Sequence, residues 1–239
     1  MKLSVIVPSY DGQLPISLAW LDAFQPDVEV IVVKGVSPVG AARNEGLKRA
    51  KGDFVAWVDS DDDIVPAFAP EVMAALRSSP DLVTFDTRIE WHDGSGRPAY
   101  SQSHRTNDFE RDYLRGKLPG QLWCKVFRRT LFEGKSFSGA CYEDTRMINA
   151  IIREARRRGV PLKVVDIPKE LYVYKRRANG LSQHRSLAEP FGCLCQMTPE
   201  VRSADEFRGL LRLWWDFAKT PLRRLRRIFG HKSANVLVF

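Results

Sequence analysis

Cysteine is scarce in this sequence, and the four that are present form no Cys-x-x-Cys pair: Cys124, Cys141, Cys193 and Cys195. Structural zinc sites and the disulfide frameworks of small secreted domains both rely on cysteines at short, regular spacings. The pattern therefore argues against a zinc site and against a secreted disulfide scaffold. It favours a reduced, cytoplasmic setting.

Long apolar runs are missing as well. No stretch reaches the roughly 18 apolar residues that a membrane-spanning helix needs. The apolar run at residues 3–7 is closed by Pro8 and is too short for a signal peptide. Repeats and low-complexity segments are also absent. We expect a soluble or peripheral protein, and 239 residues suit one large domain or a domain with an appendage.

Basic residues outnumber acidic ones and give a formal net charge of +8. Such a balance predicts anionic partners, namely nucleotide phosphates, nucleic acid or an acidic membrane surface. Leu222, Leu225, Ile228 and Phe229 fall on one helical face with arginines around them. The segment 207–229 is therefore typical of a basic amphipathic stretch at an anionic membrane surface, which would place the protein on the inner membrane face.

Short apolar runs alternate with helical patterns over the first 92 residues. The runs at 3–7, 28–33 and 54–58 are typical of buried strands, and residues 16–24 and 37–50 have helical character. Nearly continuous apolar strands separated by helices predict an α/β fold with a mostly parallel central sheet flanked by helices. In such sheets, ligands bind beyond the carboxyl ends of the strands.

Four carboxylates follow the third of these strands within five residues: Asp59, Asp61, Asp62 and Asp63. Carboxylates this close repel one another, and each resists ionisation without a counter-charge. A hard divalent cation that also holds a phosphate would supply that charge. The strand end therefore predicts a site for a nucleotide and a metal ion.

Several short motifs stand in order along the chain: Val7-Pro8-Ser9-Tyr10, Ala42-Arg43-Asn44-Glu45-Gly46, Asp59-Ser60-Asp61-Asp62, Trp123-Cys124-Lys125-Val126-Phe127-Arg128-Arg129, Tyr142-Glu143-Asp144-Thr145, Leu171-Tyr172-Val173-Tyr174-Lys175-Arg176 and Gly180-Leu181-Ser182. Together they resemble the family 2 glycosyltransferases of the GT-A fold, over roughly residues 3 to 184. The resemblance implies a GT-A domain at 1–186, with a donor-binding half at about 1–92 and an acceptor half at about 93–186. A helical C-terminal extension would occupy 187–239.

The resemblance also implies an activity. It would be the metal-dependent, inverting transfer of a sugar from a nucleotide-diphospho-sugar, a UDP-sugar foremost. The acceptor would be a hydroxyl group. The basic C-terminal segment favours a saccharide or lipid-linked glycan as the acceptor, in cell-surface polysaccharide biosynthesis, and the acids at the strand end argue against nucleic acid as a partner.

Residue roles follow from the same resemblance. Asp61, together with Asp59, would hold Mn²⁺ or Mg²⁺. Apart from the resemblance, His184 follows the late loop and could complete that metal site. Asp144 would be the general base, next to Glu143. The residues expected at the nucleotide-sugar are Pro8, Tyr10, Asp11, Arg43, Asn44, Asp59, Ser60 and Arg176. Lys125, Arg128 and Arg129 would form either a solvated or an acceptor-facing basic strip.

Two departures from the family pattern keep alternatives open. Lys34 stands where the family usually has a uracil-reading aspartate, and only residues 36–41 precede Ala42, where the family usually has about two dozen. A non-catalytic GT-A-like binding or scaffold subunit is therefore an alternative. A sugar nucleotidyltransferase is another, although residues 8–12 are not the glycine-rich phosphate loop that such an enzyme needs.

Overall fold

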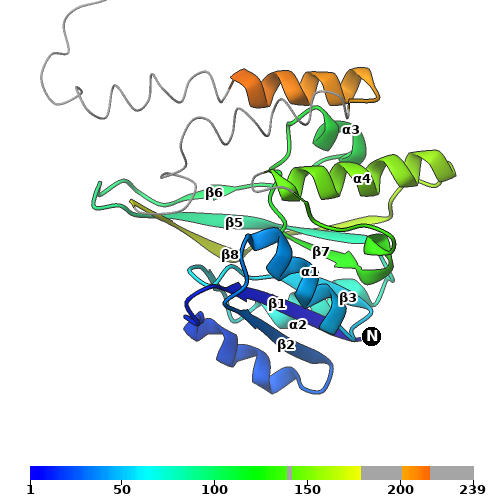
Figure 1. Cartoon of the computed structure of the whole chain (residues 1–239). Coiled ribbons are helices and arrows are strands. Elements are labelled where there is room, and N and C mark those ends of the chain that lie inside the picture. The colour runs from blue at the N-terminus through cyan, green and yellow to red at the C-terminus, as the bar shows by residue number, and fades with distance from the viewer. Residues whose placement is uncertain (139–141, 179–200, 216–239) are drawn as a thin grey trace, which may run out of the picture.

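The computed structural model describes residues 1–138, 142–178 and 201–215 (Figure 1). Over this part of the chain, eight strands form one sheet in the order β2-β1-β3-β7-β5-β8-β4, with β6 beside β5. The strands are β1 (Leu3–Ser9), β2 (Val28–Lys34), β3 (Phe54–Trp57), β4 (Asp63–Ile64), β5 (Leu82–His92), β6 (Tyr100–Gln102), β7 (Lys125–Arg128) and β8 (Val164–Arg177).

The helices pack on both faces of this sheet. They are the 3-10 helices η1 (Ile16–Phe24) and η2 (Arg129–Phe132) and the α-helices α1 (Val39–Arg49), α2 (Phe68–Leu76), α3 (Phe109–Leu114) and α4 (Glu143–Arg158). A further helix spans 204–215. Figure 1 shows this last helix beside α3 and α4, away from β1 and β2.

Two hydrophobic cores lie on opposite faces of the sheet, because successive strand residues point to opposite sides. In β1, Val5 and Val7 pack with η1 and α2, whereas Ile6 packs in the core that contains α3 and α4. The apolar stripe of α4 is buried in this second core, at Met147, Ile148, Ile151 and Ile152. Since both faces are covered, the strands read as continuous apolar runs in the sequence.

The predicted α/β fold is confirmed, but its sheet is mixed rather than mostly parallel. β1 runs parallel to β2 and β3, and β5 runs parallel to β8. β7 enters between β3 and β5 and is antiparallel to both, and β4 and β6 also pair in antiparallel fashion. A short run buried on both faces looks the same in either direction, so the sequence pattern did not reveal this reversal.

The helix at 204–215 is fastened to the rest of the protein by ion pairs. Arg115 Nε lies 2.8 Å from Asp205 Oδ1, and Arg153 donates to both carboxylate oxygens of Glu206 at 2.9 and 3.0 Å. Part of the expected C-terminal extension is thus helical. The expected boundary near residue 187, the stretch 216–229 and His184 lie outside the described residues.

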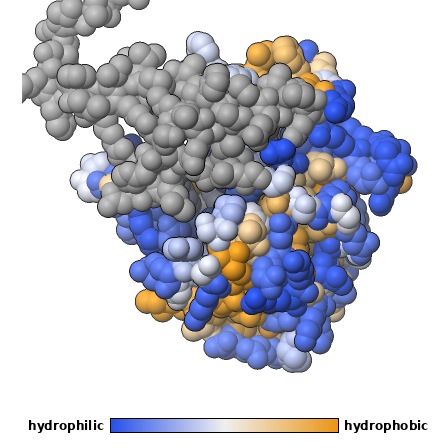
Figure 2. Space-filling view, in the orientation of Figure 1, coloured by the Kyte–Doolittle hydropathy of each residue, from blue (hydrophilic) through white to orange (hydrophobic). Residues whose placement is uncertain are grey.

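None of the helices in the described ranges is long and apolar enough to cross a membrane. In the view of Figure 2, hydrophilic residues cover most of the described surface, with smaller hydrophobic patches between them.

Candidate active site

The acidic loop after β3 contains two carboxylates that are already bonded to other parts of the protein. Asp62 is 2% exposed and accepts hydrogen bonds from Tyr172 Oη and from the Lys175 amide, both at 2.8 Å. Asp63 accepts from Ser17 Oγ at 2.7 Å and pairs with the Lys175 ammonium. Burial raises the pKa of Asp62 to about 8, against the effect of its two hydrogen bonds. These two carboxyls join the loop to η1 and β8.

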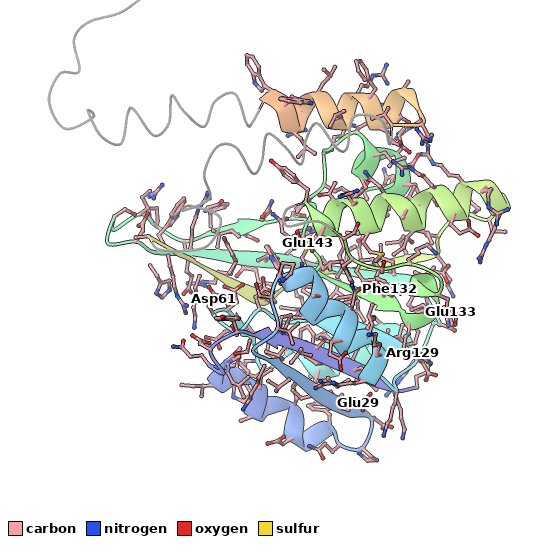
Figure 3. All side chains as sticks on the ribbon, in the orientation of Figure 1. Glu29, Asp61, Arg129, Phe132, Glu133 and Glu143 are labelled. Carbon is pink, nitrogen blue, oxygen red and sulfur yellow. The ribbon has the colours of Figure 1, made fainter. Side chains whose placement is uncertain are left out.

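Asp59 and Asp61 are the two that remain open to a ligand, with side chains 28% and 48% exposed. They lie at the carboxyl ends of β1 and β3, which are parallel and so end at the same edge. Ser60 lies half-buried between them. Figure 3 shows Asp61 and Glu143 near the same end of α1. The fold brings these two residues together although they are 82 positions apart in the sequence.

Arg43 of α1 is the centre of a buried cluster of carboxylates. Its side chain is 4% exposed, and Nη1 donates to Glu143 Oε1 at 2.5 Å and to Asp144 Oδ1. Nη2 lies 3.7 Å from Asp59 Oδ1. One guanidinium therefore faces both the Asp59 carboxylate at the end of β3 and the acidic pair at the start of α4.

Burial sets the acid–base character of this cluster. It raises the pKa of Asp144 to about 7; Arg43 opposes the rise, and the neighbouring Glu143 and Asp59 add to it. Burial also raises the pKa of Asp59, again against the effect of Arg43. A carboxyl group whose pKa lies near neutral pH is well suited to accept a proton from a hydroxyl group.

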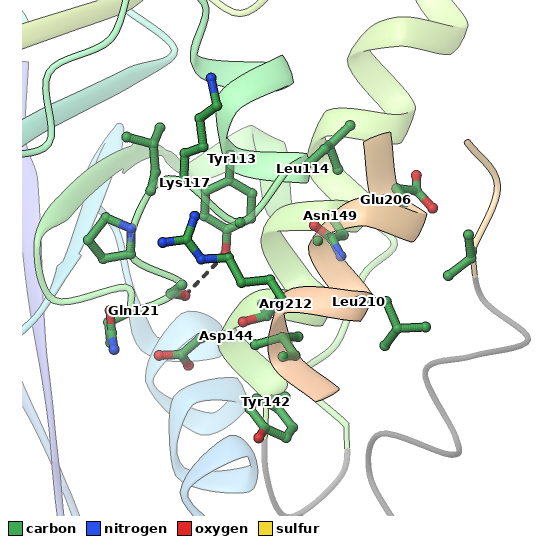
Figure 4. Close-up of a pocket in the computed structure, with 18 of the residues that line it drawn as sticks. Tyr113, Leu114, Lys117, Gln121, Tyr142, Asp144, Asn149, Glu206, Leu210 and Arg212 are labelled. Atoms are coloured by element: carbon green, nitrogen blue, oxygen red, sulfur yellow. Dashed lines mark hydrogen bonds between the residues drawn. The ribbon is translucent and has the colours of Figure 1, made fainter. Parts of the chain in front are cut away.

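Asp144 also lies on the wall of a cavity of about 500 Å³. Its Oδ2 accepts a hydrogen bond from the Leu122 amide at 3.2 Å, and its Oδ1 is held by Arg43. Figure 4 shows Asp144, Gln121 and Arg212 around this cavity; they lie on α4, on the loop between α3 and β7 and on the helix at 204–215, respectively. The cavity is large enough for a small saccharide unit beside the carboxylate.

The other residues predicted for the donor site differ in how far they are exposed. Pro8 is buried within β1, while Tyr10 is 75% exposed and Asp11 is exposed just beyond the end of that strand. The Asn44 amide donates to Phe137 O at 2.9 Å and accepts from Phe137 N at 2.8 Å. The Asn44 side chain thus holds the backbone at Phe137, and these two hydrogen bonds occupy its amide oxygen and one of its amide hydrogens.

Arg176 does not reach the acidic loop, whereas its neighbour does. Arg176 is exposed and its guanidinium lies 4.9 Å from the centre of the Trp91 ring. Arg177 Nη1 lies 3.5 Å from Asp61 Oδ2, and Nη2 donates to the Asp61 carbonyl at 2.7 Å. Side chains alternate along β8, so adjacent arginines point to opposite faces. That alternation is the signal that could have identified Arg177.

The residues at the strand end fit a divalent cation that arrives with a phosphate. Within the described ranges, no group of three histidine, cysteine, aspartate or glutamate side chains could by itself hold a metal ion. Mg²⁺, however, commonly uses only one or two carboxylates together with substrate phosphates. Asp59 and Asp61 offer that donor set, and the predicted third ligand, His184, lies outside the described residues.

The fold is an α/β fold, and the residues of the candidate site lie at the carboxyl ends of two of its parallel strands. Comparison with known proteins is more specific: the model of glycosyl transferase family 2 matches residues 4–136, which is more than half of the chain. The chain belongs to this family, as its motifs predicted.

Curated relatives match over shorter stretches. The glycosyltransferase EpsH of Bacillus subtilis is 30% identical over 106 residues, which is 42% of this chain and 30% of that protein. The GalNAc(5)-diNAcBac-PP-undecaprenol beta-1,3-glucosyltransferase of Campylobacter jejuni is 29% identical over 112 residues, 45% of this chain and 36% of that protein. The matched region thus spans about a third of each relative's length.

Solved structures share the fold. S. aureus TarS in complex with UDP-GlcNAc superposes with a TM-score of 0.61 at 18% identity, covering 95% of this chain and 76% of that one. A mannosyltransferase from Pyrobaculum calidifontis, in complex with GDP-Man and Mn²⁺, gives a TM-score of 0.52 at 16% identity, covering 99% and 76%. The expected GT-A-like α/β fold is therefore confirmed.

Proposed function

We propose that this protein is a metal-dependent, inverting glycosyltransferase that moves a sugar from a nucleotide-diphospho-sugar, a UDP-sugar foremost, to a hydroxyl of a saccharide or lipid-linked glycan. The observation that carries this proposal is the cluster around Arg43. It brings the partly buried carboxylate Asp59 and the cavity-lining carboxylate Asp144 to one guanidinium. A donor diphosphate and an acceptor hydroxyl could therefore meet beside it.

On the donor side, Asp59 and Asp61 would hold Mn²⁺ or Mg²⁺. When bound, the cation would supply Lewis-acid stabilisation of the leaving diphosphate. Arg177, whose guanidinium already contacts Asp61, stands where it can pair with phosphate oxygens. The solved neighbours with UDP-GlcNAc and with GDP-Man and Mn²⁺ support a donor of this class. Exposed Tyr10, Asp11 and Lys34 lie at the ends of β1 and β2, where the nucleotide base would be read.

On the acceptor side, Asp144 would act as the general base. It would take the proton of an acceptor hydroxyl in the adjoining cavity while that oxygen bonds to the anomeric carbon of the donor sugar. The bond from this carbon to the diphosphate oxygen breaks, and the diphosphate leaves with the electron pair. Attack from the side opposite the leaving group inverts the configuration at the anomeric carbon. Glu143, held by the same guanidinium, would keep Arg43 in place.

The cellular role belongs to the same proposal. The relative from Campylobacter jejuni is named for a polyprenol-linked glycan, which supports a saccharide or lipid-linked acceptor and a role in polysaccharide biosynthesis. Work at such an acceptor suits a cytoplasmic protein on the inner membrane face. The basic segment 207–229 would contact the anionic surface there.

A ligand screen followed by a turnover assay tests the proposal. Thermal shifts with UDP, GDP, dTDP and CMP, each with and without Mn²⁺, would identify the donor nucleotide. The matching sugar nucleotides would then be assayed for hydrolysis and for transfer. We expect one base to be preferred, with a larger shift when Mn²⁺ is present, and turnover that Asp61→Ala abolishes. Donor binding without any turnover would instead support a binding subunit.

A further inference from the structure

One wall of the cavity is a short loop beside Asp144, residues 119–122, which we call the base-facing loop. Its first three residues line the cavity. Its last residue, Leu122, donates its amide hydrogen to Asp144 Oδ2 at 3.2 Å. Gly120 lies against the first turn of α4 so closely that a Cβ at this position would be 2.5 Å from Thr145 Oγ1. The loop therefore touches both Asp144 and the residue after it.

Lys125 lies beneath this loop and is 1% exposed. Its ammonium donates to Pro119 O at 2.9 Å, to Gln121 O at 2.7 Å and to Cys124 Sγ at 3.0 Å. Three donors thus meet three acceptors, which is the full capacity of an ammonium group. Two of the acceptors are carbonyls of the base-facing loop, so the ammonium ties the two sides of that loop together.

Burying a charge away from water is costly unless polar groups replace its hydration. Lysine usually meets this cost through a carboxylate, yet the described part of the chain pairs Lys125 with none. The loop carbonyls serve instead, together with a face of the Tyr113 ring 5.7 Å away. Tyr113 Oη also donates to Gly120 O at 3.2 Å, which supports the loop from α3. The buried charge of Lys125 therefore interacts mainly with a loop that lies beside the acidic pair, which indicates that Lys125 fixes the geometry of this loop.

We propose that Lys125 is a positioning residue, whose buried ammonium fixes the base-facing loop so that the Leu122 amide and the Asp144 carboxylate keep the geometry needed for proton transfer. This inference rests on the proposed function of Asp144. It replaces the expectation of a solvated or acceptor-facing strip at Lys125. Arg128 and Arg129 leave that strip as well, because they bond to Asp81 and to Gly52 O.

The first test compares Lys125→Met, which keeps the chain length but removes the ammonium, with Lys48→Met, the same change at a side chain that is 76% exposed. We expect Lys125→Met to lower kcat for transfer by up to about 10²-fold, since a shift of about 1 Å in a reacting group can cost that much. The donor KM should change less than about twofold, because Asp59 and Asp61 are not touched. Lys48→Met should leave both constants unchanged.

Hydrogen exchange gives a readout that does not depend on activity. In Lys125→Met, the amides of 120–122 should exchange faster than in the parent protein, while those of β1 and β3 keep their protection. Unchanged exchange at 120–122 would overturn the inference. So would a kcat that falls only in proportion to the loss of folded protein. If the parent protein showed no turnover with any donor, the proposed function would fail, and exchange alone would still decide the role of Lys125.

A second pair of variants reaches the loop without touching the lysine. Gly120→Ala should push the loop away from Thr145 and reproduce the loss of kcat. Thr145→Ala removes the Oγ1 that a Cβ at 120 would strike, so the double variant should recover activity above Gly120→Ala alone. Equal kcat in Gly120→Ala and the parent would contradict the inference. An additive double variant would do the same, because the loop position would then not be the cause.

Discussion

Arg43 donates a hydrogen bond from Nη1 to Asp144 Oδ1, across 101 positions of sequence. Both side chains are largely buried, at 4% and 15% exposure. The same guanidinium faces Asp59. The contact therefore ties the segment expected to bind the donor to the helix expected to supply the base, and it places a positive charge between two carboxylates that would otherwise repel each other.

Removing this guanidinium should destabilise the protein strongly. Arg43→Met leaves Glu143 and Asp144 buried without their counter-charge, and the loss of one partner of a buried ion pair typically costs about 3–5 kcal/mol. Denaturant unfolding should show a loss of that size at neutral pH. Arg49→Met removes an arginine from the same helix where the side chain is 50% exposed, and it should cost much less. Equal losses in the two variants would mean that the cluster does not stabilise the fold.

The pH dependence of turnover should report Asp144. Its pKa is raised to about 7 by burial, and only the ionised form can accept a proton. At saturating substrates and Mn²⁺, kcat should therefore be level above about pH 8 and fall about tenfold per pH unit below 7. Asp144→Asn should lower kcat by about 10²–10⁴-fold and abolish this limb. Glu143→Gln should retain the limb; a profile that stays flat from pH 5 to 8 in the parent protein would contradict the assignment.

Local sequence patterns predicted the buried strands, the carboxylates at the end of β3 and the acidic start of α4, because each is set by residues close together in the chain. They could not pair Asp62 with Tyr172, which is 110 positions away. The residue type also gave a wrong expectation for Lys125. Lysine is seldom buried, and only the loop carbonyls around its ammonium explain why this one is. Sequence reasoning named Arg176, whereas Arg177 contacts Asp61, for a related reason: neighbouring residues on a strand point to opposite faces.

The division of the acidic loop leads to a paired test of metal binding. Asp61 is 48% exposed, whereas Asp62 already accepts two hydrogen bonds within the fold. Asp61→Asn should therefore lose the extra thermal shift that Mn²⁺ adds to the preferred nucleotide. Asp62→Asn should keep that shift, because its oxygen can still accept from Tyr172. If Asp62→Asn lost the shift and Asp61→Asn kept it, the cation would instead be assigned to Asp62.

The helix at 204–215 should control acceptor use through one close contact. Gly209 packs against α3 so tightly that a Cβ there would lie 2.1 Å from Leu114 O, and Leu210, next to it, lines the cavity. Gly209→Ala must therefore move the helix outward, and overpacking of this kind costs about 1–3 kcal/mol. If the cavity holds the acceptor, that displacement should raise the acceptor KM by about tenfold, which corresponds to a loss of about 1.4 kcal/mol in acceptor binding, while the donor KM stays nearly constant. Leu211→Ala, on the same helix but 51% exposed, should change neither constant. A donor KM that rises as much as the acceptor KM would show that the helix supports the whole domain rather than the acceptor side.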